Sequence, residues 1–152
     1  MKIIRKIITL ILLISFFAMD IFAEKKSHIN DELNEISNNL KKAVLNEDKN
    51  YLHEFVAPSG SFFIDTQYTR EQLGYLLNAK NSWLYKYLFV GENSINNYFL
   101  QAKDIKTNIY IRGPNSAMII YESSNYPAHN WVENCILKIN DRWFFDGIFS
   151  CQ

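Results

Sequence analysis

The stretch from Trp131 to Phe149, WVENCILKINDRWFFDGIF, decides the fold of this chain. β-branched and aromatic residues lie on both sides of Asn140-Asp141, a pattern typical of two strands joined by a two-residue turn. The stretch therefore predicts an antiparallel hairpin with strands at 131–139 and 142–149.

Both faces of this hairpin are apolar, because side chains alternate between the two faces of a strand. An antiparallel sheet usually leaves one face to water, so we expect the second face to be covered by helices, a ligand or another subunit. A homodimer through the sheet is the expected assembly. One face carries Trp131, Cys135, Leu137, Ile139, Phe144 and Ile148, and the other carries Val132, Ile136, Trp143, Phe145 and Phe149.

A second hairpin is predicted just before the first. Residues 105–112 and 117–123 are enriched in β-branched and aromatic residues, and Gly113-Pro114-Asn115 between them is a turn sequence. The polar segment 124–130, which contains Pro127, separates the two hairpins. The second half of the chain is therefore predicted to form a run of antiparallel strands.

Helices are predicted in the first half of the chain. Over 27–46, apolar residues recur every three or four positions, which is typical of an amphipathic helix. Asp48 can cap a short second helix that ends at Ala57-Pro58, because proline disfavours helical geometry in the residue before it. A short strand is predicted at 61–65.

A third helix is predicted to begin after Thr69. Gln72 lies three residues further on, and this spacing matches a capping box. An apolar stripe recurs beyond Asn81, which leaves open whether the same helix continues there. Residues 94–102 fit helical spacing better than strict alternation, so a short helix capped by a serine is predicted there.

This order of elements resembles the nuclear-transport-factor-2-like superfamily. The stretch 136–148, in which a polar turn precedes Trp143 and alternating apolar residues, looks like the closing hairpin of many members. The resemblance implies an α+β fold with N-terminal helices packed in the concavity of a curved antiparallel sheet, a cystatin-like cone that ends in β-hairpins. The superfamily contains ketosteroid isomerases, scytalone dehydratase, polyketide cyclases and many exported domains without known activity. The fold alone therefore does not identify the function.

Catalytic members of the superfamily use an Asp, often with His or Tyr, at the open end of the cone. By the predicted register, Asp146 and Glu133 project from the face around Leu137 and Phe144, where burial would raise a carboxyl pKa and produce a general base. Alternatively, Asp146 bonds a neighbouring strand or loop, and Glu133 reaches solvent. The candidates are Asp146 and Tyr121 for catalysis, and Tyr110, Trp131, Glu133 and Phe144 for ligand binding.

Other chemistries find little support in the sequence. His28, His53 and His129 do not pair with Cys, Asp or Glu at ligand spacing, so no metal site is predicted. No nucleophile elbow, Walker loop or dinucleotide fingerprint occurs, so we expect no cofactor. Lys41-Lys42 and the group 103–106 are short and have acids beside them, which argues against a nucleic-acid partner.

Residues 1–23 read as a secretory signal peptide. A basic start precedes an apolar run at 7–17, and the segment ends in the small residue Ala23. An uncleaved anchor is the alternative, but the run is short and Asp20 interrupts it. Cleavage would leave one domain at 24–152 with 13 Lys and Arg against 15 Asp and Glu, exported to a periplasm or secreted, with no membrane association.

The two cysteines, Cys135 and Cys151, would lie in a compartment that permits a disulfide. The predicted register places Cys135 opposite Asp146, so Cys151 lies five residues further along, about 16 Å in a strand. Disulfide Cα atoms tolerate only roughly 4.4–6.8 Å. A bridge therefore requires the C-terminal tail to fold back, or a partner chain.

Two functions follow from these observations. The first is an exported binding or interaction domain without catalysis, which holds a small apolar ligand or a protein partner in the cone or on the sheet face. The alternative is a cofactor-free isomerase, dehydratase or cyclase, with Asp146 as general base and Tyr121 or Tyr110 polarising a carbonyl. Aromatic residues in the strands would line a pocket in either case, or form plain core.

Overall fold

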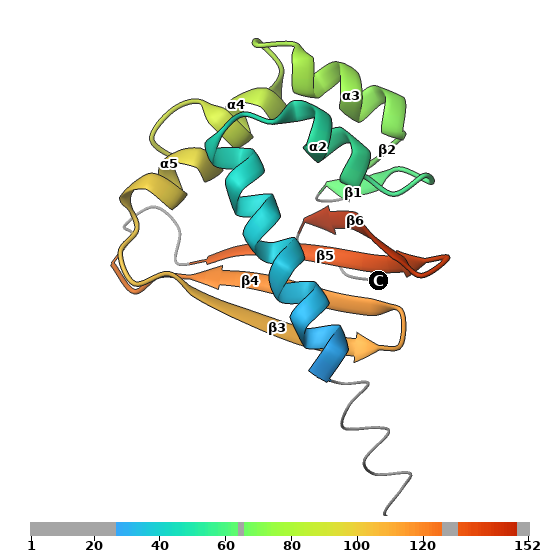
Figure 1. Cartoon of the computed structure of the whole chain (residues 1–152). Helices are drawn as coiled ribbons and strands as arrows, with labels where there is room; N and C mark the ends of the chain where they lie inside the picture. The colour runs from blue at the N-terminus through green and yellow to red at the C-terminus, as the bar shows by residue number, and fades with distance from the viewer. Residues whose placement is uncertain (1–26, 64–65, 126–130, 149–152) are drawn as a thin grey trace, which may run out of the picture. The chain divides into compact units, whose positions relative to one another are not determined.

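The computed structural model describes residues 27–63, 66–125 and 131–148. These residues form an α+β fold in which helices pack against one face of a sheet, as Figure 1 shows. The predicted α+β class is therefore confirmed. The predicted signal peptide lies outside the described residues, as do His129 and Phe149.

The chain divides into two compact units, residues 1–35 and residues 36–152. The described part of the first unit, residues 27–35, is helical, and the helix continues to residue 45 in the second unit. All other described elements belong to the second unit. The predicted amphipathic helix over 27–46 is confirmed, and we call it the N-terminal helix.

The other elements follow the predicted order closely. The helices are α2 (Lys49–Phe55), α3 (Arg70–Asn78), α4 (Trp83–Phe89) and α5 (Ile95–Gln101). The strands are β1 (Ser61–Phe63), β2 (Thr66–Tyr68), β3 (Lys106–Gly113), β4 (Ser116–Glu122), β5 (Trp131–Ile139) and β6 (Arg142–Ile148). Strand β2 was not expected from the sequence.

The capping box at the start of α3 is confirmed. Thr69 Oγ1 accepts a hydrogen bond from the Gln72 backbone N–H at 3.1 Å, and Gln72 Oε1 accepts one from the Thr69 N–H at 2.8 Å. The helix ends at Asn78, so the apolar stripe beyond Asn81 belongs to the separate helix α4. Ser82 marks this break, because its hydroxyl caps α4.

The strands form one sheet in the order β2-β1-β6-β5-β4-β3. Strands β3 to β6 pair antiparallel with one another, whereas β1 runs parallel to β6. Gly60 makes the β1–β2 hairpin possible, because its φ is +91° and a Cβ there would lie 2.0 Å from the Tyr68 carbonyl oxygen. Residues 36–45 of the N-terminal helix cross the face of β4 and β5 (Figure 1).

The turn between β5 and β6 is the predicted two-residue turn. Asn140 and Asp141 both have positive φ, 49° and 61°, as a type I′ turn requires. The predicted register holds from this turn to the Ile136–Phe145 pair. A bulge follows, so Cys135 pairs with Gly147 rather than with Asp146. The predicted register is therefore wrong beyond this point, because β6 contains one extra residue there.

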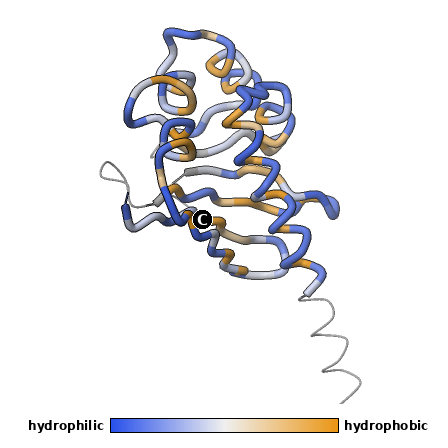
Figure 2. Tube along the Cα trace, turned by 60° about the vertical axis from the view of Figure 1, so that its left-hand side comes forward, coloured by the Kyte–Doolittle hydropathy of each residue, from blue (hydrophilic) through white to orange (hydrophobic). Residues whose placement is uncertain are grey.

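The two predicted faces of this hairpin are recovered from the turn to the Ile136–Phe145 pair. Beyond the bulge the prediction is wrong, because Gly147 pairs with Cys135, and position 148, which was predicted to share a face with Cys135, falls on the opposite face. The face toward the helices, here called the inner face, carries Ala117, Ile119, Tyr121, Val132, Ile136, Trp143 and Phe145, all buried. The opposite face, the outer face, also holds two buried side chains, Cys135 and Phe144. Figure 2 shows the hydropathy changing along the strands as their residues alternate between these faces.

Cys135 is disulfide-bonded and only 1% exposed. The chain has one other cysteine, Cys151, which lies outside the described residues. The sequence left open whether a bridge forms, and the structure shows that Cys135 is bonded.

Candidate functional site

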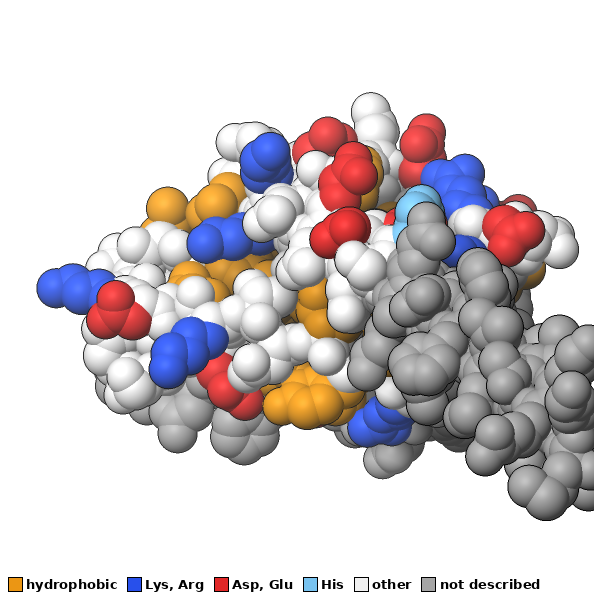
Figure 3. All heavy atoms as spheres, turned by 60° about the horizontal axis from the view of Figure 1, so that its bottom comes forward, with side chains coloured by type: hydrophobic (Ala, Val, Ile, Leu, Met, Phe, Trp, Pro, Cys, Tyr) orange, Lys and Arg blue, Asp and Glu red, His pale blue; other side chains and the backbone are white. Residues whose placement is uncertain are grey.

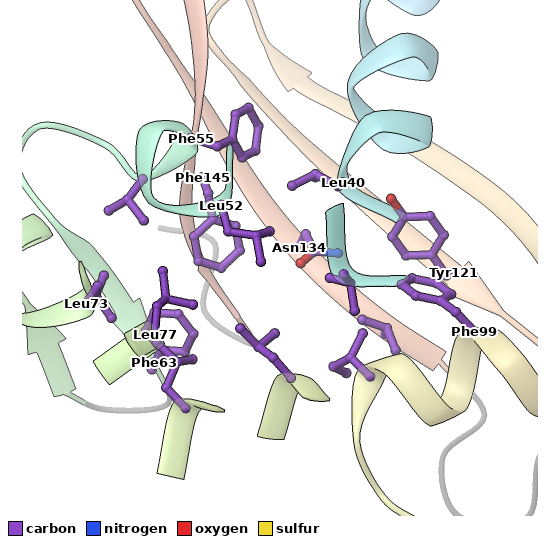
Figure 4. A pocket seen from close by; sticks show the side chains of 16 residues that line it. Leu40, Leu52, Phe55, Phe63, Leu73, Leu77, Phe99, Tyr121, Asn134 and Phe145 are labelled. Atoms are coloured by element: carbon purple, nitrogen blue, oxygen red, sulfur yellow. The ribbon is translucent and has the colours of Figure 1, made fainter. Parts of the chain in front are cut away.

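An apolar cavity of about 70 Å³ lies between the helices and the inner face of the sheet, within residues 36–152 (Figure 4). Every helix of this unit contributes to its wall, together with β1, β4, β5 and β6. Most of the wall is Leu, Ile, Val and Phe, including Leu40, Phe55, Leu77, Phe99 and Phe145. The cavity is thus the meeting point of segments from both halves of the chain.

Two polar side chains, Tyr121 and Asn134, line this otherwise apolar wall. Strand pairing explains their position, because Tyr121 of β4 pairs with Val132 and Ile119 pairs with Asn134 of β5. Alternation along each strand then directs both side chains to the inner face.

The Tyr121 hydroxyl is fully engaged within the protein. It donates a hydrogen bond to the Ser37 carbonyl at 2.8 Å and accepts one from the Ser37 hydroxyl at 3.0 Å. Figure 4 shows this hydroxyl turned toward the N-terminal helix, while the ring faces the cavity. Burial raises the pKa of Tyr121, so the side chain is neutral at physiological pH. Its hydrogen bonds hold the N-terminal helix against the sheet.

Asn134 differs from Tyr121 because its amide makes no hydrogen bond to any described residue. The side chain is half-buried at the centre of the sheet, and Figure 4 shows it beside the Tyr121 side of the cavity. A side-chain amide offers two N–H donors and a carbonyl acceptor. Sequence reasoning missed this residue, although its place between Val132 and Ile136 in an inward-facing series was a usable signal.

Asp146 lies in β6 beside the bulge and does not line the cavity. Its carboxyl group is half-buried, and burial raises its pKa. This direction agrees with the predicted effect of burial on a candidate general base.

Asp146 and Tyr121 are well separated in the sheet. β5 lies between their strands, so the two backbones are about 10 Å apart. Along the strands, Phe145 aligns through Ile136 with Ala117, four residues from Tyr121. The sheet therefore does not bring the two predicted catalytic side chains to one reacting carbonyl.

Three of the four predicted ligand-binding residues belong to the outer face. Tyr110 pairs with Met118 and is 48% exposed, and Glu133 is half-buried. Phe144 is buried, with the Arg142 guanidinium 5.1 Å from the centre of its ring. The side chain of Trp131 lies outside the described part of the structure. Tyr110, Glu133 and Phe144 do not line the cavity.

Charges of both signs are spread over the surface that Figure 3 shows, with apolar atoms between them and no large patch of one sign. Within the described ranges, no three His, Cys, Asp or Glu side chains gather as metal ligands would. None of the described helices is long and apolar enough to cross a membrane.

Comparisons with protein-family models, with curated proteins and with solved structures found no match to this chain. Its function must therefore be inferred from its own residues.

Proposed function

We propose that this protein is an exported, non-catalytic domain that binds a small apolar molecule in the cavity between the helices and the inner face. The observation that carries the proposal is the cavity wall itself, which is apolar apart from Tyr121 and Asn134. Burial of a ligand's apolar surface against such a wall supplies roughly 25 cal/mol per Å².

The size of the cavity limits the ligand. About 70 Å³ is less than the roughly 150 Å³ of an engineered apolar cavity that takes benzene, and far below the roughly 300–1,000 Å³ of drug-sized sites. The ligand, or the part of it that enters, is accordingly a short chain or a compact apolar group.

Export is part of the same proposal. It is supported by the leader-like pattern of residues 1–23 and by the disulfide of Cys135, since such bonds persist in oxidising compartments. A nuclear-transport-factor-2-like cone is likewise proposed, supported by the order of the elements and by residues 36–45 of the N-terminal helix crossing the antiparallel strands β4 and β5.

The proposal is tested by native mass spectrometry of the full chain purified from an exporting host, compared with the denatured sample. The expected result is a non-covalent small-molecule adduct that disappears on denaturation. Leu52→Phe, which adds volume at a half-buried position of the wall, should remove the adduct. Leu100→Phe is the matched control, because Leu100 is 65% exposed and outside the wall.

If the wild-type protein carries no adduct and takes up no small apolar molecule added to it, cavity binding is wrong. Retention of the adduct in Leu52→Phe as well as in Leu100→Phe would assign it to a different surface.

A second candidate function has one observation in its favour, the raised pKa of Asp146. In this hypothesis the protein is a cofactor-free isomerase, dehydratase or cyclase with Asp146 as general base. NMR detection of α-proton exchange in a panel of enolisable ketones in D₂O tests it. Asp146→Asn should abolish exchange without changing the fold, and an undiminished exchange rate in this variant removes the hypothesis.

A further inference from the structure

Asn134 interrupts a series of buried apolar side chains on the inner face of β5. Its neighbours in this series, Val132 and Ile136, are 4% and 1% exposed. The strand itself is internal to the sheet, between β4 and β6. A leucine or valine would suit this environment better than an amide, if packing were the only requirement.

The amide at this position has no partner among the described residues. Asn134 is half-buried, and its amide atoms are not among the fully buried polar atoms without a partner, so the amide retains accessible surface where water or a ligand can bond it. The nearest polar group in the wall, the Tyr121 hydroxyl, is already occupied by Ser37. The amide of Asn134 is therefore the polar group of the wall that can form hydrogen bonds with a bound molecule.

A water molecule would be held poorly here. The cavity has room for water, which needs roughly 10–15 Å³ of probe-occupied volume. A buried water, however, typically makes about three hydrogen bonds, and Asn134 alone cannot supply them. Displacing weakly held water with a ligand group that bonds the same amide favours binding.

The wall also excludes charge. It contains no Asp, Glu, Lys, Arg or His, so an ionised group that entered would lose its hydration without gaining an opposite charge. The ligand's polar group must consequently be neutral.

We infer that Asn134 is the specificity-determining residue of the cavity and selects a neutral ligand that carries one hydrogen-bonding group, a hydroxyl or carbonyl, on a small apolar body. This inference rests on the proposed function, because it assumes that the cavity binds a ligand. It goes further by naming the residue that recognises the ligand and the chemical class that fits.

The test compares two small probes that differ by one hydroxyl, 1-propanol and propane, in sealed NMR samples of the full chain and of Asn134→Leu. The affinity ratio of alcohol to alkane should be about five- to tenfold higher in the wild type, as expected for one net hydrogen bond. Asn108→Leu is the matched control, because Asn108 lies on the outer face and bonds Glu122. Its affinity ratio should equal that of the wild type.

Two further readouts make the test independent of how well the variant folds. In the wild type, the side-chain N–H signals of Asn134 should shift with 1-propanol and stay unchanged with propane. Without a probe, Asn134→Leu should melt at a higher temperature than the wild type, because it removes an unpaired polar group.

The possible results distinguish the role of Asn134 from the proposed binding of a ligand in the cavity. If both probes shift the methyl signals of the cavity but the affinity ratio is the same in wild type and Asn134→Leu, the role of Asn134 is wrong and the cavity function stands. If neither probe shifts those signals, both are wrong.

Discussion

At the scale of single residues, the pair Ser37–Tyr121 joins the N-terminal helix to β4 of the sheet. Both residues are about 2% exposed, and the Tyr121 hydroxyl accepts a hydrogen bond from the Ser37 hydroxyl and donates one to the Ser37 backbone carbonyl. Tyr121→Phe would leave the Ser37 groups buried without their partner. We expect the free energy of unfolding to fall by about 1–3 kcal/mol, measured by urea denaturation. A change below about 0.5 kcal/mol would show that the contact is not maintained in solution.

Buried tyrosines also predict how stability depends on pH. Burial raises the pKa of Tyr121, and it raises those of Tyr87 and Tyr98 to about 12, above the ordinary value of 10. A raised pKa means that the unfolded chain loses its protons first, so stability is retained below pH 10 and lost as the pH rises above it. Urea denaturation at pH 8 to 11 should show this loss, and Tyr121→Phe should reduce its slope. A flat profile to pH 11 would contradict the burial of these hydroxyls.

At the scale of elements, the sequence predicted most of the fold because local signals coincided with periodicity. The Thr69–Gln72 capping box and the Asn140-Asp141 turn are each complete within four residues. The pairing of β1 with β2 and the bulge opposite Cys135 were not predicted, because no short local signal marks them. Both depend on which strand lies alongside, and periodicity within one strand does not contain that information.

The candidate site was less predictable than the elements. Alternation assigned Tyr121 to a face correctly, but only the three-dimensional contact with Ser37 reveals that its hydroxyl is occupied. Asn134 was overlooked because an isolated Asn in a strand has no spacing motif. Its importance depends on helices that are distant in sequence and close the cavity over it.

The β5–β6 turn provides a prediction at this scale. Asp141 has φ of 61°, a left-handed conformation that glycine adopts without strain. Asp141→Gly should therefore raise the free energy of unfolding by up to about 1 kcal/mol, because Asn-Gly suits a type I′ turn better. The measurement is urea denaturation, with Asp141→Ala as a control that should be destabilised. The opposite order of the two variants would contradict this turn type.

At the scale of the whole molecule, the disulfide of Cys135 is expected to matter for stability. Bridging to Cys151 would close a loop of about 15 residues and stabilise the protein by about 3 kcal/mol. Reduction, or the double replacement of both cysteines by serine, should lower the melting temperature. Equal melting temperatures of the oxidised and reduced protein would contradict the prediction.

The outer face gives a prediction about assembly. Tyr110 is 48% exposed there, next to the half-buried Met118 and Ile120, and we propose that a second copy of the chain covers this face. Sedimentation should detect a dimer that Tyr110→Glu weakens. Tyr75→Glu on α3, where the tyrosine is 74% exposed, is the control. A wild-type protein that is monomeric at all concentrations would refute the dimer.

The cavity wall joins residues from Leu40 to Phe145, which has a consequence for the order of folding. The Ser37–Tyr121 bonds alone connect positions 84 residues apart, and such distant contacts form only after the intervening chain has been closed into a loop. A chain that emerges from its N-terminus can form its helices early but has no cavity until the last hairpin follows. The apolar faces of the helices therefore stay uncovered until the last hairpin has been made, and uncovered apolar surface of this kind favours aggregation.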